Sequence, residues 1–359
     1  MSFDIDTSDA LHARVRGEIA RGASLEDPST RALALDVARF QFDHVAPVRR
    51  LFEARGIAPS AIERIDDIPA MPTDVFKLRR VAAHPPELDR RVFRTSGTTV
   101  GARGAHPFRT LATYEAAALA WGKKMLLAPP LDRAFVLAPR FADAPESSLG
   151  FMIELFVREL GLPHETFVDG AAVDAAAIER AARAARERGE RVVVFGTAFA
   201  YVYALDALAG RRLALPEGSR ALLTGGFKGR TREVPEGELR TAIGGVFDLP
   251  ATHVVGEYGM TELSSQFYES TLADDHAPPW VYAEPPWARV VPVDASTLEP
   301  VKDGDAGIAR IEDLLNVDSA FAVLTADRVR RVAGGFELLG RAPGAPPRGC
   351  SIALDEMLS

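Results

Sequence analysis

Cysteine and lysine are the two residue types that this sequence uses least. The chain has one cysteine among 359 residues, so it cannot form an internal disulfide bond, which is typical of a protein in a reducing cytoplasm. Only five lysines occur, at positions 77, 123, 124, 228 and 302, and the formal net charge is −8. Because the sequence has no basic block, it lacks the positive surface that nucleic-acid binding requires.

Long hydrophobic runs are absent as well. No apolar run reaches the roughly 18 residues that a membrane-spanning helix needs, so we expect no transmembrane segment. Residues 1–9 are polar and acidic, which is unlike a signal peptide. A hydrophobic content of 47% with 26% charged residues is ordinary for a globular protein, and a chain of this length can bury one large core or two ordinary ones.

The first ninety residues are predicted to be helical. Thr7-Ser8-Asp9 can cap a helix that runs to about Arg21, and Asp27-Pro28 can open another with apolar residues at helical spacing through Leu51. A proline-rich connector is expected at 68–73.

From residue 92 onward, short apolar runs alternate with helical patterns. Strands are predicted at 134–137, 191–195, 221–223 and 252–255, and helices at 111–127, 148–160, 173–188 and 232–243. This alternation is typical of an α/β fold, in which a mainly parallel sheet has helices on its faces.

The pattern changes again after Glu262. Short β runs, broken by Gly, Pro and Asp, are predicted at 281–283, 288–293, 308–311, 321–324 and 336–338. They indicate a small barrel or an antiparallel subdomain. We therefore divide the chain into a helical N-terminal segment (1–90), an α/β nucleotide-binding core (91–262), and a β-rich subdomain with a short C-terminal tail (263–359).

Two short motifs bear on function. Thr95-Ser96-Gly97-Thr98-Thr99 follows a strand-like run, and its hydroxyl and backbone N–H groups can surround phosphate oxygens. It is not a Walker A loop, and such a run taken alone is more often a plain loop. The second motif, Glu257-Tyr258-Gly259-Met260-Thr261-Glu262, follows about 160 residues later and offers an aromatic ring, a hydroxyl and two carboxylates.

In this order the two motifs resemble those of the adenylate-forming enzymes, the superfamily of acyl-CoA synthetases and related ligases. The first resembles their phosphate loop, and residues 258–262 match their Y-G-x-T-E motif. The chain is more closely similar to the LuxE-like acyl-protein synthetases of bacterial fatty-acid reductase systems. The features shared with that branch are the overall length and the segments 223–229, 257–263 and 348–351.

The resemblance implies an adenylate-forming large-domain fold, without the full mobile C-terminal domain, that activates a fatty acid with ATP and Mg²⁺. The residues it assigns to ATP are Thr95, Ser96, Gly97, Thr98 and Thr99 on the β- and γ-phosphates, Thr261 on the α-phosphate, Gly225, Gly226 and Tyr258 at the adenine, Asp327 at the ribose, and Glu257, Gly259 and Arg341 by their place in the motifs. Glu262 is the implied Mg²⁺ ligand, since this cation prefers carboxylate, phosphate and water oxygens. Taken alone, the two glycines are equally consistent with a turn at a strand end, and Asp327 with a turn residue.

The sequence also departs from the family pattern at its cationic residues. The family loop commonly continues with glycine and a lysine, whereas here Arg103 can supply the charge. The catalytic lysine of the mobile domain has no counterpart near the end of this chain. Lys228 is a possible substitute, although it is as readily an ordinary surface lysine.

The remaining candidates for catalysis are Cys350 and His253. A lone cysteine is usually a small buried hydrophobe, but Cys350 follows a proline- and glycine-rich run, and Arg348 can favour its thiolate form. The resemblance implies that Cys350 accepts the acyl group from acyl-AMP and passes it to a partner acyl reductase. His253 can line the acyl pocket, act near the reacting carboxylate, or be a hydrogen-bonded strand residue. A phenylacetate-type ligase that uses free CoA and a non-catalytic scaffold in a reductase complex are the alternatives to this function.

Overall fold

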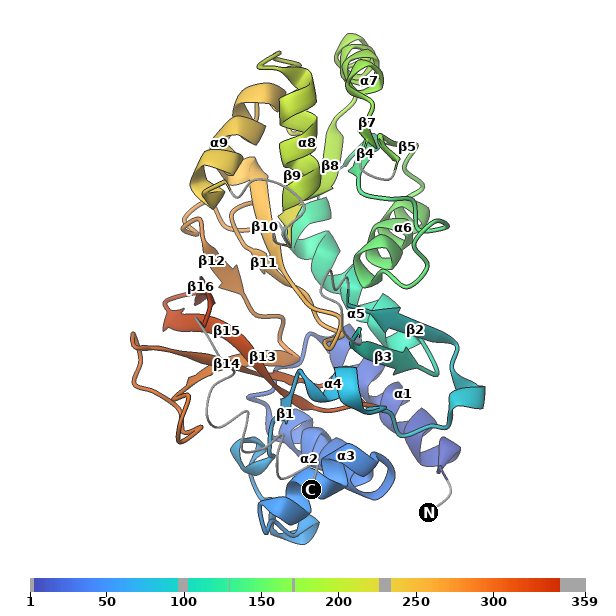
Figure 1. Ribbon diagram of the computed structural model, residues 1–359, viewed down its shortest axis with the longest axis vertical. Helices are drawn as coiled ribbons and strands as arrows, with labels where there is room; N and C mark the ends of the chain where they lie inside the picture. Colours follow the sequence, from blue (N-terminus) through green and yellow to red (C-terminus); the bar gives the residue numbers. More distant parts are fainter. Residues whose placement is uncertain (1–2, 96–102, 129, 170–171, 226–233, 343–359) are drawn as a thin grey trace.

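The structure, a computed structural model, describes residues 3–95, 103–128, 130–169, 172–225 and 234–342 (Figure 1). The described chain forms an α/β fold built on one 12-stranded mixed sheet. Two small two-stranded sheets lie beside it, one of β2 (Arg91–Arg94) and β3 (Ala105–Phe108), the other of β6 (Val168–Asp169) and β7 (Ala172–Val173). The α/β class expected from the sequence is confirmed.

The N-terminal segment is helical, as predicted, but with different boundaries. Helix α1 (Ile5–Arg21) begins one turn early, because the side chain of Asp4 accepts a hydrogen bond from the backbone N–H of Thr7 at 3.0 Å. The second predicted helix is two helices, α2 (Pro28–His44) and α3 (Ala46–Ala54), separated by the extended residue Val45. Pro47 lies in the first turn of α3, the part of a helix that tolerates a residue without an N–H group. Five short elements follow before the first hairpin: 3₁₀ turns at Pro59–Ala61, Ile65–Asp67 and Pro86–Leu88, strand β1 (Met71–Pro72), and helix α4 (Val75–Leu78).

Five parallel strands form one end of the sheet, in the order β5, β4, β8, β9, β10, with β5 at the edge. Their bounds are β4 (Arg133–Leu137), β5 (His164–Thr166), β8 (Val192–Thr197), β9 (Arg220–Thr224) and β10 (Val254–Tyr258). The strand predicted at 252–255 starts later, because a 3₁₀ turn occupies Ala251–His253. Helix α5 (Ala112–Gly122), with a π-helical extension (Lys123–Leu127), precedes these strands, and the helices between them are α6 (Ser148–Leu160), α7 (Ala175–Arg188), α8 (Ala198–Leu208) and α9 (Glu236–Phe247).

The two faces of these strands belong to two different hydrophobic cores. In β4, Phe135 and Leu137 pack with α7, α8 and α9, whereas Ala134 and Val136 pack with α5, α6 and the N-terminal helices. This alternation follows from the two-residue period of a strand. The parallel strands are therefore covered on both sides, and their carboxyl ends are left to form a site.

The β-rich part of the chain continues the same sheet. Antiparallel β11 (Phe267–Glu269) pairs with β10, and the pairing runs on through β12, β16, β15, β14 and β13. The bounds of these strands are β12 (Val281–Ala283), β13 (Ala288–Val293), β14 (Ala306–Asp313), β15 (Ala322–Val332) and β16 (Gly335–Arg341). Of the two arrangements considered from the sequence, the antiparallel one is observed. The division of the chain at residue 262 falls between two paired strands and stays a prediction.

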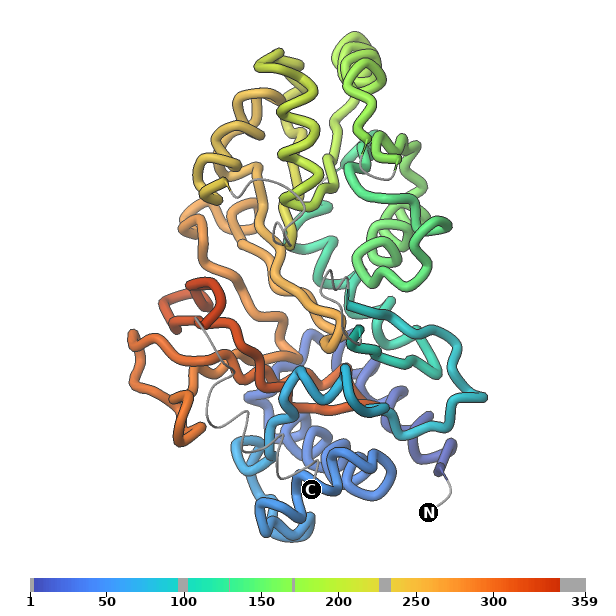
Figure 2. Tube along the Cα trace, in the orientation of Figure 1, coloured from blue at the N-terminus to red at the C-terminus, as the bar shows by residue number. Residues whose placement is uncertain are grey.

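The N-terminal segment is tied to the β-rich part by strand β1 (Met71–Pro72). This strand lies in the predicted connector and pairs in parallel with β15, Met71 opposite Val323 and Pro72 opposite Leu324. Figure 2 follows the chain from the N-terminal helices to this junction. In the described part of the chain, no helix is long and apolar enough to cross a membrane.

Candidate active site

The ends of the predicted phosphate loop are held by the hairpin β2 (Arg91–Arg94) and β3 (Ala105–Phe108). At the base of the loop, the backbone N–H of Thr95 donates to the carbonyl of Gly104 at 2.9 Å, and the N–H of Gly104 donates back to Thr95 Oγ1 at 2.9 Å. Arg103 donates from Nε to the Thr95 carbonyl at 2.6 Å and pairs with Glu146 at 2.7 Å. The guanidinium expected to supply charge to the loop therefore shares that charge with a carboxylate. The loop residues Ser96, Gly97, Thr98 and Thr99 lie outside the described residues.

The second motif begins at the carboxyl end of β10. A β-carbon on Gly259 would lie 2.5 Å from Glu257 Oε1, so a side chain at this position would displace the Glu257 carboxylate. The main-chain carbonyls of Thr261 and Glu262, at the end of the motif, both accept hydrogen bonds from buried side chains. His106 Nδ1 lies 2.8 Å from the carbonyl oxygen of Thr261, and Asn316 Nδ2 donates to that of Glu262 at 3.1 Å.

The two motifs meet at Gly104. A β-carbon on Gly104 would lie 3.0 Å from Thr95 Cγ2 and 3.3 Å from Glu262 Oε1. The same point is 3.6 Å from Lys77 Cγ. The hydroxyl residue at the loop base and the predicted metal ligand thus come together, although about 170 residues separate them in the chain. Lys77 was missed by the sequence reasoning, which named it only among the five lysines and placed it in the helical N-terminal segment.

A second group of predicted residues meets on the β15–β16 hairpin. Tyr258 donates from Oη to Asp327 Oδ2 at 2.8 Å, and Asp327 lies opposite Arg341 in the sheet register. The Nε of Arg341 lies 3.4 Å from the other carboxylate oxygen of Asp327. An aromatic ring, a carboxylate and a cation from three strands therefore lie side by side.

Burial controls the protonation of the carboxyl groups in this region. It raises the pKa of Glu262 to about 7, although the nearby charges of Lys77 and Arg341 oppose the shift. Burial likewise raises the pKa of Glu257 to about 7, against the hydrogen bond that Thr224 donates to it. Each carboxyl therefore gains charge near neutral pH.

The region fits a magnesium ion that takes one carboxylate from the protein and its other ligands from phosphate and water oxygens. In the part of the chain that the structure describes, no group of three or more His, Cys, Asp or Glu side chains is placed to hold a metal. A single carboxylate, Glu262, lies beside the hydroxyl residue Thr95. That donor set suits Mg²⁺, which typically takes one or two carboxylates together with phosphate and water oxygens.

Several predicted residues are not brought to this cluster. His253 lies in the 3₁₀ turn before β10, at the opposite end of that strand from Tyr258. Burial and the nearby charge of Arg220 lower its pKa, and its role stays a prediction. Gly225 ends β9 with φ +68°, a conformation that favours glycine, and a β-carbon there would meet open space. Gly226, Lys228 and Cys350 lie outside the described residues.

Aromatic residues on β8 and at the start of α8 belong to the hydrophobic cores. Phe195 and Tyr201 are fully buried, and Tyr201 donates from Oη to the carbonyls of Val194 and Leu222. They are core residues. A cavity of about 600 Å³ lies at the carboxyl end of β4, lined among others by Phe141, and it includes none of the predicted site residues.

Comparison with protein families identifies the family to which the chain belongs. The family model described as "Acyl-protein synthetase, LuxE" matches residues 23–359. The chain belongs to the LuxE family of acyl-protein synthetases. The resemblance drawn from the two motifs is confirmed, and the match includes the N-terminal helices from α2 onward.

Two curated relatives are similar along most of their length. The long-chain-fatty-acid–luciferin-component ligase of Aliivibrio fischeri is 23% identical over 276 residues, which are 74% of this chain and 70% of the relative. The ligase of the same name from Vibrio harveyi is 21% identical over 340 residues, 91% of this chain and 87% of the relative.

Solved structures of ligases share the fold. A 2-hydroxyisobutyryl-CoA ligase with 2-HIB-AMP and CoA superposes with a TM-score of 0.64 at 14% identity, over 90% of this chain and 77% of that one. ATP-bound MatB from Rhodopseudomonas palustris gives 0.51 at 14% identity. That match includes 73% of this chain and 49% of MatB, so this chain spans about half the length of MatB. At such identities the likeness establishes the fold, which is that of adenylate-forming ligases.

Proposed function

We propose that this LuxE-family protein activates a fatty acid with ATP and then carries the acyl group on its own cysteine. In the first step, a carboxylate oxygen of the acid attacks the α-phosphorus of ATP. The bond from that phosphorus to the bridging oxygen breaks, and pyrophosphate leaves with the electron pair. The names of the two curated relatives support a long-chain fatty acid as the acid.

The single observation that carries the proposal is the meeting of Thr95 and Glu262 around Gly104. Catalysis of phosphoryl and adenylyl transfer consists mostly of positioning the reactants and neutralising charge. A hydroxyl residue that opens a hydroxyl-rich segment, placed beside an acidic metal ligand, meets both needs. Magnesium, when bound, would supply the positive charge that the triphosphate requires, and Glu262 with phosphate oxygens would hold it.

The nucleoside end of ATP is assigned to the second cluster. Tyr258 presents a ring next to Asp327, whose carboxylate can accept hydrogen bonds from ribose hydroxyls. When Asp327 binds the ribose, Arg341 and the Tyr258 hydroxyl keep its charge in place. We assign Thr261, which directly precedes the metal ligand, to the α-phosphate.

In the second step, the thiolate of Cys350 attacks the acyl carbonyl of acyl-AMP. A thioester bond forms, the bond to the phosphate oxygen breaks, and AMP leaves with the electron pair. An acyl reductase would then receive the acyl group. This step rests on the sequence position of Cys350 and on the family description of acyl-protein synthetase.

Intact-protein mass spectrometry tests both steps. The wild-type protein, incubated with ATP, Mg²⁺ and acids of different chain length, should gain the mass of one acyl group, which hydroxylamine removes. Cys350→Ser should lose this label and keep acid-dependent ATP–pyrophosphate exchange. Exchange without labelling, together with thioester formation on added CoA, would favour the CoA-ligase alternative. The absence of exchange with every acid would favour the scaffold.

A further inference from the structure

Lys77 reaches the candidate active site from the N-terminal segment, and its position is fixed by tertiary structure. Its helix, α4, follows β1, whose parallel pairing with β15 is continued by a hydrogen bond from the N–H of Thr73 to the carbonyl of Leu324. Val75 and Phe76 are buried, and the Phe76 ring packs edge-on against His106 of the β2–β3 hairpin at 5.8 Å. A helix anchored in this way has a defined orientation, and its lysine has a defined direction.

The stem of Lys77 lies against the base of the phosphate loop. Its Cγ lies 3.6 Å from the point where a β-carbon of Gly104 would be, and Glu262 Oε1 lies 3.3 Å from the same point. The charge of Lys77 acts on the pKa of Glu262, lowering it against the effect of burial. The lysine and the predicted metal ligand therefore flank the same loop base.

The ammonium group of Lys77 is available for another partner. It pairs with Asp74 at 2.7 Å, but both side chains are more than 40% exposed. An exposed pair three residues apart on a short helix contributes little stability. A triphosphate carries more negative charge than Asp74, and the flexible four-carbon stem lets the ammonium turn to it.

The geometry points to Lys77 as a phosphate-binding catalytic residue, which supplies to the ATP triphosphate a positive charge at the base of the β2–β3 loop. The inference rests on the proposed adenylation. It assigns the cationic role to Lys77 rather than to Arg103, because the guanidinium of Arg103 is held at the loop base by the Thr95 carbonyl as well as by Glu146. It also gives a reason for the position of β1, because without that pairing α4 would not be held beside Gly104.

Chemical footprinting of the wild-type protein tests this contact directly. Lysines are labelled with an amine-reactive acetylating reagent, with and without Mg²⁺ and a non-hydrolysable ATP analogue, and labelling at each lysine is read by mass spectrometry. Lys77 should be protected by the nucleotide. Lys302, exposed between β13 and β14, serves as the internal control and should not change. Equal labelling of Lys77 with and without bound nucleotide would overturn the inference.

Kinetics of ATP–pyrophosphate exchange provide the second measurement. Lys77→Met keeps the apolar stem and removes the charge, so the KM for ATP should rise about tenfold or more, the equivalent of about 1.4 kcal/mol for a lost charged contact. Lys77→Arg should retain most of the affinity, and Lys302→Met should behave as wild type. Asp74→Asn, which frees the ammonium, should leave the KM unchanged or lower it. A wild-type KM in Lys77→Met, or an equal rise in Asp74→Asn, would contradict the assigned role.

The two proposals can fail separately. If the wild-type protein neither binds the ATP analogue by calorimetry nor catalyses exchange, the proposed function is wrong. If it does both while Lys77 stays fully reactive, the function stands and only the role of Lys77 is wrong.

Discussion

His106 Nδ1 lies 2.8 Å from the main-chain carbonyl oxygen of Thr261. A carbonyl oxygen only accepts, so Nδ1 must carry the proton. The ring is buried, and burial lowers the pKa of His106 to about 4, so it donates as the neutral imidazole at physiological pH. This bond joins the strand that follows the phosphate loop to the residue that precedes the predicted metal ligand.

We expect the His106 bond to matter for activity more than the volume of the ring. His106→Leu leaves the Thr261 carbonyl without its donor in a buried place, which should cost about 1–3 kcal/mol of unfolding free energy and reduce exchange activity. His106→Asn offers an amide N–H near the position of Nδ1 and should recover part of both. Urea unfolding and ATP–pyrophosphate exchange measure the two effects. If both variants lose the same activity, ring packing rather than the hydrogen bond is responsible.

The Tyr258–Asp327 pair predicts a graded response at the nucleoside. Tyr258→Phe keeps the ring and removes one hydrogen bond to the carboxylate. Because the hydroxyl acts on ATP only through Asp327, the KM for ATP should rise a few fold, less than the roughly tenfold or more expected when a direct bond to a charged group, worth ~1.5–3 kcal/mol, is lost. Asp327→Ala removes the proposed ribose acceptor itself and should raise the KM further. The same pair of variants assayed with ATP and 2′-deoxy-ATP separates the roles. Asp327→Ala should discriminate between these nucleotides less than wild type, and unchanged discrimination would argue against ribose contact.

Much of the fold follows from the sequence, because the signals are local. The helix predicted at 148–160 is found with those same bounds as α6. The alternation of apolar strands with amphipathic helices correctly predicted an α/β fold with parallel strands. Where predicted helix boundaries differ from the structure, a neighbouring residue caps or interrupts the helix. Asp4 caps α1 ahead of Thr7, and an extended residue before Pro47 divides the second helix.

The contacts that complete the site are not local, and the sequence did not give them. Strand β1 is two residues long and contains a proline, so only its partner on β15 makes it a strand. Lys77 follows this strand on the short helix α4, and no local pattern in the sequence marked it as a site residue. The motifs themselves placed Tyr258, Glu262 and Asp327 in order, but their packing partners, such as Asn316, come from the turn between β14 and β15.

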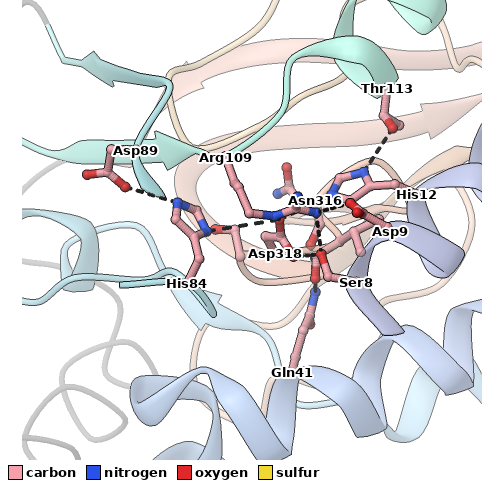
Figure 3. Close-up of polar contacts among 12 residues, drawn as sticks. Ser8, Asp9, His12, Gln41, His84, Asp89, Arg109, Thr113, Asn316 and Asp318 are labelled. Carbon is pink, nitrogen blue, oxygen red and sulfur yellow. Dashed lines mark hydrogen bonds and ion pairs between the residues drawn. The ribbon is translucent and has the colours of Figure 1, made fainter. Parts of the chain in front are cut away.

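That turn is the centre of a buried polar network, shown in Figure 3. Asp318 accepts from Ser8 Oγ at 2.6 Å and lies 3.2 Å from His12 Nε2, both on α1. Gln41 of α2 donates to the carbonyl of Asn316 at 2.6 Å. The N-terminal helices thus fix, through hydrogen bonds, the turn whose Asn316 donates to the Glu262 carbonyl.

Asn316 should therefore act on the metal ligand as a positioning residue. Asn316→Asp is nearly isosteric, but it replaces the donor to the Glu262 carbonyl with an acceptor. The Mg²⁺ concentration needed for half-maximal exchange should therefore rise about tenfold, within the 10–100-fold range for residues that hydrogen-bond to a metal ligand. Ser319→Ala is the matched control, because it removes one buried hydrogen bond from the same turn, to the carbonyl of Val81, without contact to Glu262. An equal change in both variants would indicate general loosening of the turn.

Glu257 gives a prediction for stability against pH. Its pKa is about 7 in the folded protein, above the ordinary value of 4.5, so the folded state binds the proton more tightly than the unfolded state does. Its stabilising contribution is complete below pH 4.5 and is lost as the pH rises toward 7. Glu257→Gln should match wild type near pH 4 and be more stable at pH 8.5, by at most about 3 kcal/mol at ~1.4 kcal/mol per pKa unit. Thermal unfolding without ATP at the two pH values measures this, and a pH-independent difference would contradict it.

Glu262 predicts how the proposed reaction depends on metal and on pH. Only the ionised carboxylate binds Mg²⁺, and burial raises the pKa of Glu262 to about 7, so exchange activity at low Mg²⁺ should fall as the pH drops below 7. Because the cation competes with the proton, higher Mg²⁺ should move this fall to lower pH. Glu262→Gln keeps the size of the side chain and should reduce exchange by about 100-fold or more, as expected when a metal ligand is lost, and removing metal from wild type with EDTA should do the same. The remaining activity of Glu262→Gln should also lose the dependence of its pH midpoint on Mg²⁺. Exchange in Glu262→Gln with the wild-type Mg²⁺ requirement and pH profile would show that the cation is held elsewhere.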